Sequence, residues 1–212
     1  MIKKKLTIMV SSSVYGIEEL LDRIYAVLTG IGYEVWMSHK GTIPVEAHCT
    51  AFDNCIKAVQ HCDLFLGLIT PHYGSGVSPG DISITHKEIR EAIRLRKPRW
   101  FLAHDYVVFA RKLLNDLNYK GSSGREALKL KDHASAVSDL RVIDMYEESI
   151  LAEIPNYEDR HGNWVQKYRK DEDALLYAVA QFSRYQEAER FIEENFSQPD
   201  KVLNSIEREK FR

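Results

Sequence analysis

The feature that most constrains the fold is an uncharged run at residues 64–69, Leu-Phe-Leu-Gly-Leu-Ile. Every position is apolar or glycine, so both faces of the strand that it predicts must be covered, as in a parallel sheet with helices on each side. A glycine-rich loop follows, and then a helical stretch. Ligands of open α/β sheets bind beyond the carboxyl ends of the strands, so this loop lies where a site is expected.

The same strand-then-helix pattern repeats on both sides of this run. Three more strands are predicted, at residues 6–12, 33–37 and 100–103. Apolar side chains recur at helical spacing over residues 17–31, 51–62 and 85–96. This alternation predicts an α/β fold with a doubly wound parallel sheet and right-handed crossovers.

The second half of the chain carries weaker signals. Residues 106–117 have helical apolar spacing, and residues 118–138 predict a loop with some helix. A fifth strand is expected at residues 140–144, and a C-terminal helix at residues 171–195. Because no repeat or linker interrupts the chain, we expect a single domain over residues 1–212.

Composition excludes several classes of protein. With 44% hydrophobic and 28% charged residues in a chain of 212, a folded globular protein is expected. The formal net charge of -2 provides no field that would attract nucleic acid or an anionic membrane. No segment reads as a transmembrane helix or an export signal, which predicts a cytoplasmic protein.

The three cysteines are expected to be reduced and structural. Cys49, Cys55 and Cys62 fall within one predicted helix and its ends, and an odd count without an export signal argues against disulfides. His48 and His61 lie beside two of them, but the spacing matches no standard zinc pattern. The sequence therefore predicts neither a metal site nor a bound cofactor.

Three segments are expected to meet at the carboxyl edge of the sheet. They supply the candidate ligand-binding residues Ser11, Ser12, Ser13, Tyr73, Gly74, Ser75, Ser83 and Thr85. The serines precede a helix N-terminus, where free N–H groups favour phosphate, and they could equally cap that helix. Trp36 and Tyr73 could stack on a flat ring. The glycine fingerprint of dinucleotide-binding turns and the Walker lysine pattern are both absent.

Glu88 admits two interpretations. It lies in the first turns of the helix at this edge, where a carboxylate can act on a bound ligand. Thr85 and Glu88 also have the spacing of a capping box, in which Glu88 would only hold a backbone N–H of its own helix. Both interpretations stay open at the level of sequence.

The segments around Glu88 resemble known families. His86 to Ala92, one strand and one loop after residues 63–69, resembles the region of the catalytic glutamate in TIR domains that cleave NAD, and more loosely that of nucleoside 2-deoxyribosyltransferases. Residues 10–13, 62–67, 73–74 and 83–88 together are similar to an uncharacterised TIR-like domain found at the amino end of signalling NTPases. The resemblance spans roughly the first half of the chain.

The resemblance implies a flavodoxin-like (TIR-like) sheet of about five strands in the order 2-1-3-4-5, here with an α-helical C-terminal extension. It also implies cleavage of the N-glycosidic bond of NAD or a related nucleotide, with Glu88 as the catalytic carboxylate. A role in bacterial stress or phage-defence signalling would accompany that activity. The alternative is a non-catalytic TIR-like module that senses a nucleotide, self-associates or docks on a protein partner.

Overall fold

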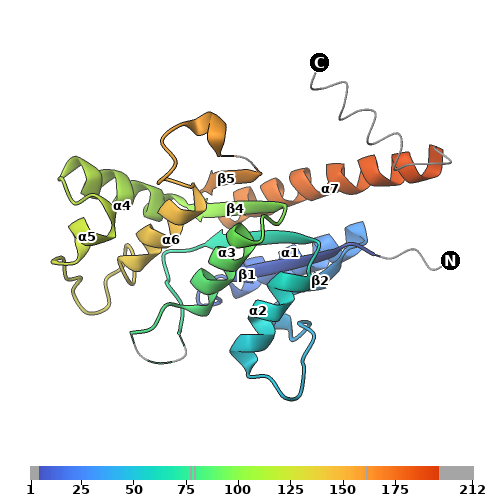
Figure 1. Ribbon diagram of the computed structural model, residues 1–212, viewed down its shortest axis with the longest axis horizontal. Helices are drawn as coiled ribbons and strands as arrows, with labels where there is room; N and C mark the ends of the chain where they lie inside the picture. The colour runs from blue at the N-terminus through green and yellow to red at the C-terminus, as the bar shows by residue number, and fades with distance from the viewer. Residues whose placement is uncertain (1–4, 77, 79, 161, 196–212) are drawn as a thin grey trace. The chain divides into compact units, whose positions relative to one another are not determined.

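The chain folds around a five-stranded parallel sheet of order β2-β1-β3-β4-β5, as predicted (Figure 1). The computed structural model describes residues 5–76, 78, 80–160 and 162–195. Its strands are β1 (Thr7–Ser12), β2 (Glu34–Trp36), β3 (Leu64–Ile69), β4 (Arg99–His104) and β5 (Asn163–Tyr168). All four neighbouring pairs are parallel, so the strand-to-helix loops open at one edge of the sheet.

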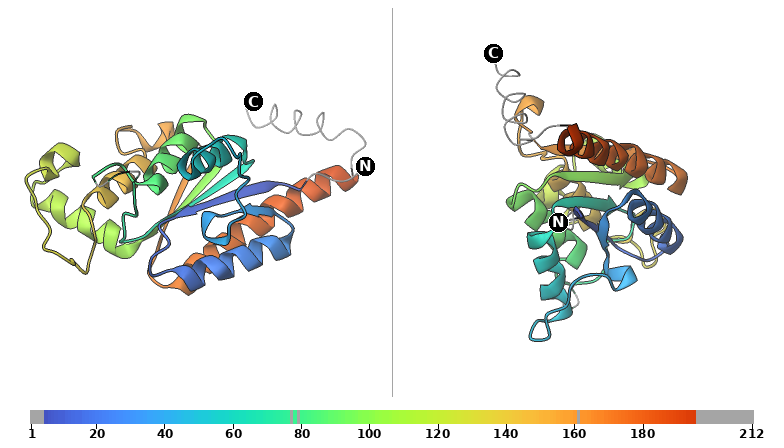
Figure 2. Two further views of the ribbon diagram at one scale, coloured as in Figure 1. Left: turned by 90° about the horizontal axis from the view of Figure 1, so that it is seen from below. Right: turned by 90° about the vertical axis from the view of Figure 1, so that its right-hand side faces the viewer.

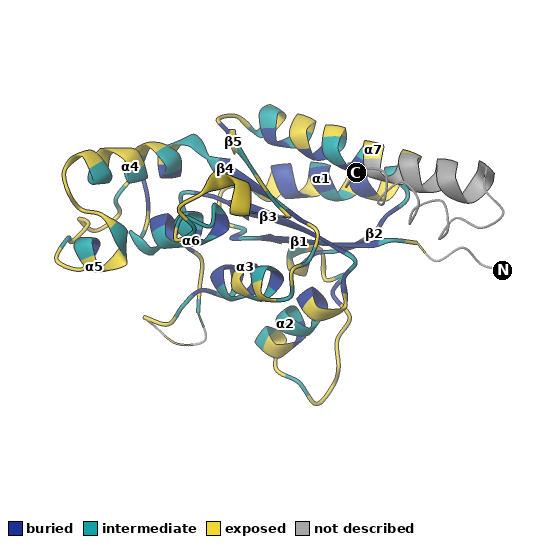
Figure 3. Cartoon of the chain, turned by 45° about the horizontal axis from the view of Figure 1, so that its top comes forward, coloured by how far each residue is buried: buried dark blue, intermediate teal, exposed yellow. Residues whose placement is uncertain are grey.

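Helices cover both faces of the sheet. The helices of the described residues are α1 (Glu18–Ile31), α2 (Ala51–His61), α3 (Ile84–Arg94), α4 (Asp105–Asp116), α5 (Gly121–Arg125), α6 (Arg141–Ser149) and α7 (Asp171–Asn195), with short 3-10 turns η1 (Ser38–Lys40) and η2 (Tyr157–Asp159). Figures 2 and 3 show α1 on one face and the α2–α3 pair on the other. This arrangement explains why β3 is buried at all six positions.

The glycine within β3 is required by packing. A Cβ atom at Gly67 would lie 2.8 Å from the ring of Phe101 on β4. The rings of Phe65 and Phe101 meet edge to face, with centroids 6.1 Å apart, and both are fully buried. Any side chain at this position would displace an aromatic ring from the centre of the core.

The fifth strand is not where the sequence predicts it. Residues 140–144 belong to the start of α6, and the sheet is completed by β5 instead. Val142, Met145 and Ser149 are buried on one side of α6, a helical period that a five-residue window could not separate from a strand. β5 is the edge strand next to β4 in the described sheet, and it carries polar side chains at several positions, so it lacks an apolar strand signal.

Contacts between residues divide the chain into two compact units, Met1–Leu175 and Leu176–Arg212. The first contains the whole sheet and α1 to α6, and the described part of the second is the continuation of α7. The single domain over residues 1–212 stays a prediction. Within the part of the chain that the structure describes, no helix combines the length and the apolar character needed to cross a membrane.

Candidate functional site

The start of α3 decides between the two interpretations of Glu88. The helix begins one residue after Ser83, whose hydroxyl accepts a hydrogen bond from the N–H of His86. Thr85 therefore lies inside the first turn, and it is buried rather than capping. The capping box predicted for Thr85 and Glu88 is wrong, because the chain offers a serine two residues earlier and the helix starts there.

Glu88 points away from its own helix end, toward the sheet. Its carboxylate accepts a hydrogen bond from the hydroxyl of Ser11 on β1 and a second from the thiol of Cys55 on α2. Glu88 is buried, with only 4% of the residue exposed. Burial raises the pKa of Glu88 to about 7, and the hydrogen bonds from Ser11 and Cys55 oppose that rise only in part. Glu88 thus titrates near neutral pH.

Ser12 and Ser13, at the end of β1, form a short segment, here called the serine loop, that is hydrogen-bonded to the segment after β3. The hydroxyl of Ser13 donates to the carbonyl of His72, at 2.7 Å, and lies 2.6 Å from the hydroxyl of Thr70. The Ser12 hydroxyl donates to the carbonyl of Ser13. Ser13 is buried, so its polar atoms serve this cross-link rather than an open anion site.

In the glycine-rich loop between β3 and α3, Gly74 lies next to the serine loop. Gly74 has φ of +81°, and a Cβ atom there would lie 3.3 Å from Cβ of Ser13. Gly74 and Ser75 are exposed, and the carbonyl of Ser75 accepts the N–H of Ile84 at the start of α3. Ser11 thus contacts Glu88 inside the protein, whereas Gly74, next to Ser13, is exposed.

A second polar group, formed by Tyr73, His86, Arg90, Arg141 and Glu148, lies on the other side of α3. The Tyr73 hydroxyl lies 2.8 Å from Nδ1 of His86, and Nε2 of His86 lies 3.1 Å from a carboxylate oxygen of Glu148, without the alignment of a hydrogen bond. The guanidinium of Arg90 binds Glu148 through two nitrogens, at 2.7 and 2.6 Å. Arg141 lies over the ring of Tyr73, 4.5 Å from its centroid.

A cavity of about 630 Å³ opens beside this second group. Its wall includes Tyr73 and His86 together with four basic and four acidic side chains: Arg90, Arg111, Lys120, Arg141, Asp144, Glu147, Glu148 and Glu153. Because the charges balance and Arg90 and Arg111 are paired with Glu148 and Glu147, the wall has no excess positive charge to select phosphate. Glu88 does not line this cavity.

Comparison with known proteins identifies the family. The sequence model for the domain of unknown function DUF4062 matches residues 7–208. The chain belongs to the DUF4062 family. No functionally curated protein matches it. Among solved structures, the CMP N-glycosidase BcmB of Clostridium botulinum is similar at 15% identity and a TM-score of 0.40, over 81% of this chain and 95% of that one.

In this DUF4062 chain the predicted site residues fall into two layers. Ser11, Ser13, Ser83, Thr85 and Glu88 are buried at one edge of the sheet, while Gly74 and Ser75 lie at the surface above them. Trp36 is not part of this group: it packs against the core and its indole N–H donates to Glu34.

Several residues of the site escaped the sequence analysis. Cys55 contacts Glu88, and His72 lies in the loop after β3, where the edge rule that selected Tyr73 could have found it. The sequence analysis names His86 only as the first residue of the segment that resembles TIR domains, not as a site residue. Glu148 belongs to α6, part of which was predicted to be a strand. Away from this edge, a loop before α2 brings Glu46, His48 and Cys49 together, with one possible ligand atom from each within 4.8 Å of the others.

Proposed function

We propose that this chain cleaves the N-glycosidic bond of a nucleotide, NAD or a related one, with Glu88 as the catalytic carboxylate. One observation carries the proposal: Glu88 is a buried carboxylate at the ligand-binding edge of the sheet, held by Ser11 and Cys55 and not used as a helix cap. The resemblance of residues 63–92 to TIR domains that cleave NAD supports this chemistry.

The chemistry suits the properties of Glu88. As the base departs with the electron pair of the glycosidic bond, positive charge develops on the anomeric carbon and the ring oxygen. A carboxylate beside that carbon stabilises this transition state more than the ground state, or attacks the carbon to form an ester that water then hydrolyses. Ser11 keeps Glu88 oriented in either case.

Substrate must approach Glu88 past the glycine loop. Gly74 contacts Ser13, and Tyr73 is held by His86 and by Ser138, whose hydroxyl accepts the N–H of Tyr73 at 3.0 Å. In this proposal, binding moves Tyr73 and Gly74 outward and releases the Ser13 hydroxyl from the carbonyl of His72. Ser11 and Ser13 then meet the ribose and phosphate, and Tyr73 gains a base to stack on.

The test is release of free base by the purified full-length chain. Wild type, Glu88→Gln and Glu91→Gln are incubated with NAD, NADP and purine and pyrimidine nucleotides, and the products are separated by chromatography. Glu91 lies on the same helix but is paired with Gln60 and Arg94, away from Ser11, so it is the matched control. We expect Glu88→Gln to lose at least about a hundredfold in rate and Glu91→Gln to keep the wild-type rate.

The pH dependence gives an independent check. Because the ionised form of Glu88 is the active one, kcat/KM should rise with pH and level off above about 7, the pKa to which burial raises this carboxyl. The proposal fails if wild type, at high protein concentration and with every nucleotide, releases no more base than Glu88→Gln.

The second candidate is a non-catalytic association module. Helix α4 and the residue after it present four apolar side chains at helical spacing, all more than two fifths exposed: Tyr106, Phe109, Leu113 and Leu117. Sedimentation of wild type and of a Phe109→Ser, Leu113→Ser variant tests it. Concentration-dependent self-association that this variant loses, together with no base release, would favour the module.

A further inference from the structure

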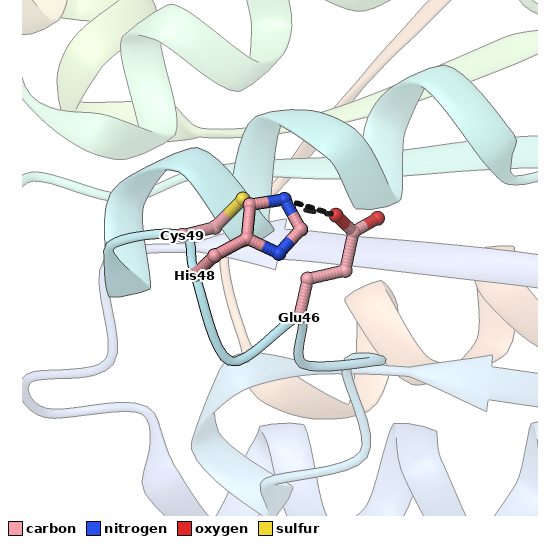
Figure 4. A group of neighbouring side chains, drawn as sticks. All are labelled: Glu46, His48 and Cys49. Carbon is pink, nitrogen blue, oxygen red and sulfur yellow. Dashed lines mark hydrogen bonds and ion pairs between the residues drawn. The ribbon is translucent and has the colours of Figure 1, made fainter.

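Three side chains on the loop between η1 and α2 converge away from the Glu88 site. They are Glu46, His48 and Cys49, which offer a carboxylate, an imidazole and a thiol with one atom each within 4.8 Å of the others (Figure 4). The Cys49 thiol is free. All three belong to one short loop, and because their spacing matches no familiar zinc pattern, the sequence analysis, which noted His48 beside Cys49, predicts no metal site there.

Two of the three distances between these atoms are close to those of a tetrahedral metal site, and all three atoms lie within 4.8 Å of one another. Nε2 of His48 lies 3.3 Å from Oε2 of Glu46, and Sγ of Cys49 lies 3.7 Å from the same oxygen. With zinc bond lengths of about 2.0 Å to oxygen and nitrogen and about 2.3 Å to sulfur, neighbouring tetrahedral ligand atoms lie about 3.3 to 3.6 Å apart. A metal ion could therefore enter with only small side-chain shifts.

The loop is held in this shape by α2. The buried side chain of Asn54 accepts the N–H of Glu46 at 2.9 Å, and the N–H of Cys49 donates to the carbonyl of Glu46 at 3.0 Å. Thr50 and Asp53 form a capping box directly after Cys49, which fixes where the helix begins. Ligands preset by their backbone lose little entropy when a metal binds.

A positive charge already lies beside two of the three ligands. The ammonium of Lys57, on α2, lies 2.5 Å from Oε2 of Glu46 and 3.0 Å from Sγ of Cys49. Its side chain is 35% exposed, so it can swing into water while its stem stays in place. Glu46 and Cys49 thus favour a cation, and Lys57 competes for that place.

We propose that Glu46, His48 and Cys49 bind a divalent ion of the zinc class, with water in the fourth position. A mixed sulfur, nitrogen and oxygen set suits zinc or cobalt, whereas magnesium and calcium prefer oxygen alone. On binding, the Cys49 thiol releases its proton to solvent and Lys57 moves out. The metal would fix the shape of the loop that leads into α2, the helix that carries Cys55.

Cobalt titration of the reduced full-length chain tests this site. A cobalt–thiolate bond adds a charge-transfer absorption band that oxygen and nitrogen ligands do not give, so the spectrum reports Cys49 directly. We expect the band to saturate at one cobalt per chain and to disappear when zinc is added. Cys49→Ser should abolish the band, and His48→Ala and Glu46→Gln should each weaken binding more than about tenfold.

Two further variants sharpen the test. Lys57→Met removes the competing charge but keeps the length of the stem, so it should tighten cobalt binding several-fold. His61→Asn, an exposed histidine at the end of α2 outside the group, should leave binding unchanged. The proposal is overturned if wild type shows no thiolate band, if Cys49→Ser keeps wild-type affinity, or if Lys57→Met binds no tighter than wild type.

Discussion

Glu88 and Glu148 are two carboxylates, both shielded from water at least in part, whose neighbouring side chains differ in charge. Burial raises the pKa of Glu88 to about 7, since its neighbours Ser11 and Cys55 are uncharged. Burial acts in the same direction on Glu148, but Arg90 and His86 outweigh it and lower the pKa of Glu148 to about 2. The same chemical group is thus poised for proton chemistry in one place and fixed as an ion pair in the other.

The two groups of residues are separated by one helix. His86 and Glu88 are two positions apart on α3, so they face nearly opposite directions: His86 toward Tyr73 and Glu148, Glu88 toward Ser11 and Cys55. An ion-paired carboxylate stabilises the structure but is held by its partners. A carboxylate without a cation is costly to the fold when charged, which is the common signature of a functional group.

The largest effect on stability is expected from Glu88→Gln. The folded state holds the Glu88 proton more tightly than the unfolded state, whose pKa is near 4.5. The contribution of Glu88 to the free energy of unfolding is therefore fully present below pH 4.5 and is lost as the pH rises through about 7. At about pH 9 the variant should be more stable than wild type by up to about 3 kcal/mol, and near pH 4 the two should be alike.

Denaturant unfolding of wild type and Glu88→Gln across this pH range measures the difference. Glu91→Gln is the control, because Glu91 is paired with Arg94, which lowers its pKa, and should show no such gain at high pH. A Glu88→Gln variant that is less stable than wild type at every pH would contradict the comparison, because it would mean that the charged carboxylate stabilises the fold.

Glu148→Gln should act in the opposite direction. The folded pKa of Glu148 is lowered, so its contribution is present above about pH 4.5 and is lost as the pH falls through about 2. The side chain is 29% exposed, and solvent screening reduces the expected loss to about 2 kcal/mol at neutral pH. Thermal unfolding at several pH values checks this. Glu153→Gln, an exposed residue of the same cavity wall, should change stability little.

The sequence could place Glu88 and Ser11 together but could not supply their surroundings. Both follow from one rule, that loops after parallel strands share an edge, and the structure joins them by a hydrogen bond. Cys55 reaches Glu88 only because α2 and α3 pack side by side, and the packed face of a helix pair is not encoded in local periodicity.

The errors have local physical causes. α6 begins with Leu140, Val142 and Ile143 close together, which resembles a short strand until the buried Met145 and Ser149 extend the helical period. With α6 misassigned, the partner of Arg90 and His86 could not be named. The expected capping box failed for a similar reason, because Ser83 and Thr85 were both acceptable caps and only the backbone decides between them.

Ser11→Ala tests whether the hydroxyl matters because of the charge on Glu88. The Ser11 hydroxyl donates to the carboxylate and holds the pKa of Glu88 lower than burial alone would. Without it the ionised form loses about 1.5 kcal/mol of hydrogen bonding, a typical value for a bond to a charged group, while the protonated form loses less. The destabilisation should therefore grow as the pH rises from about 5 to about 8, and the pH at which Glu88 titrates should move upward.

The neighbouring Ser12→Ala removes a hydroxyl that donates to the carbonyl of Ser13, and it should show a smaller loss with no such pH dependence. Equal losses for Ser11→Ala at both pH values would mean that Glu88 does not change its charge in this range, and that the contrast with Glu148 is one of packing rather than of ionisation.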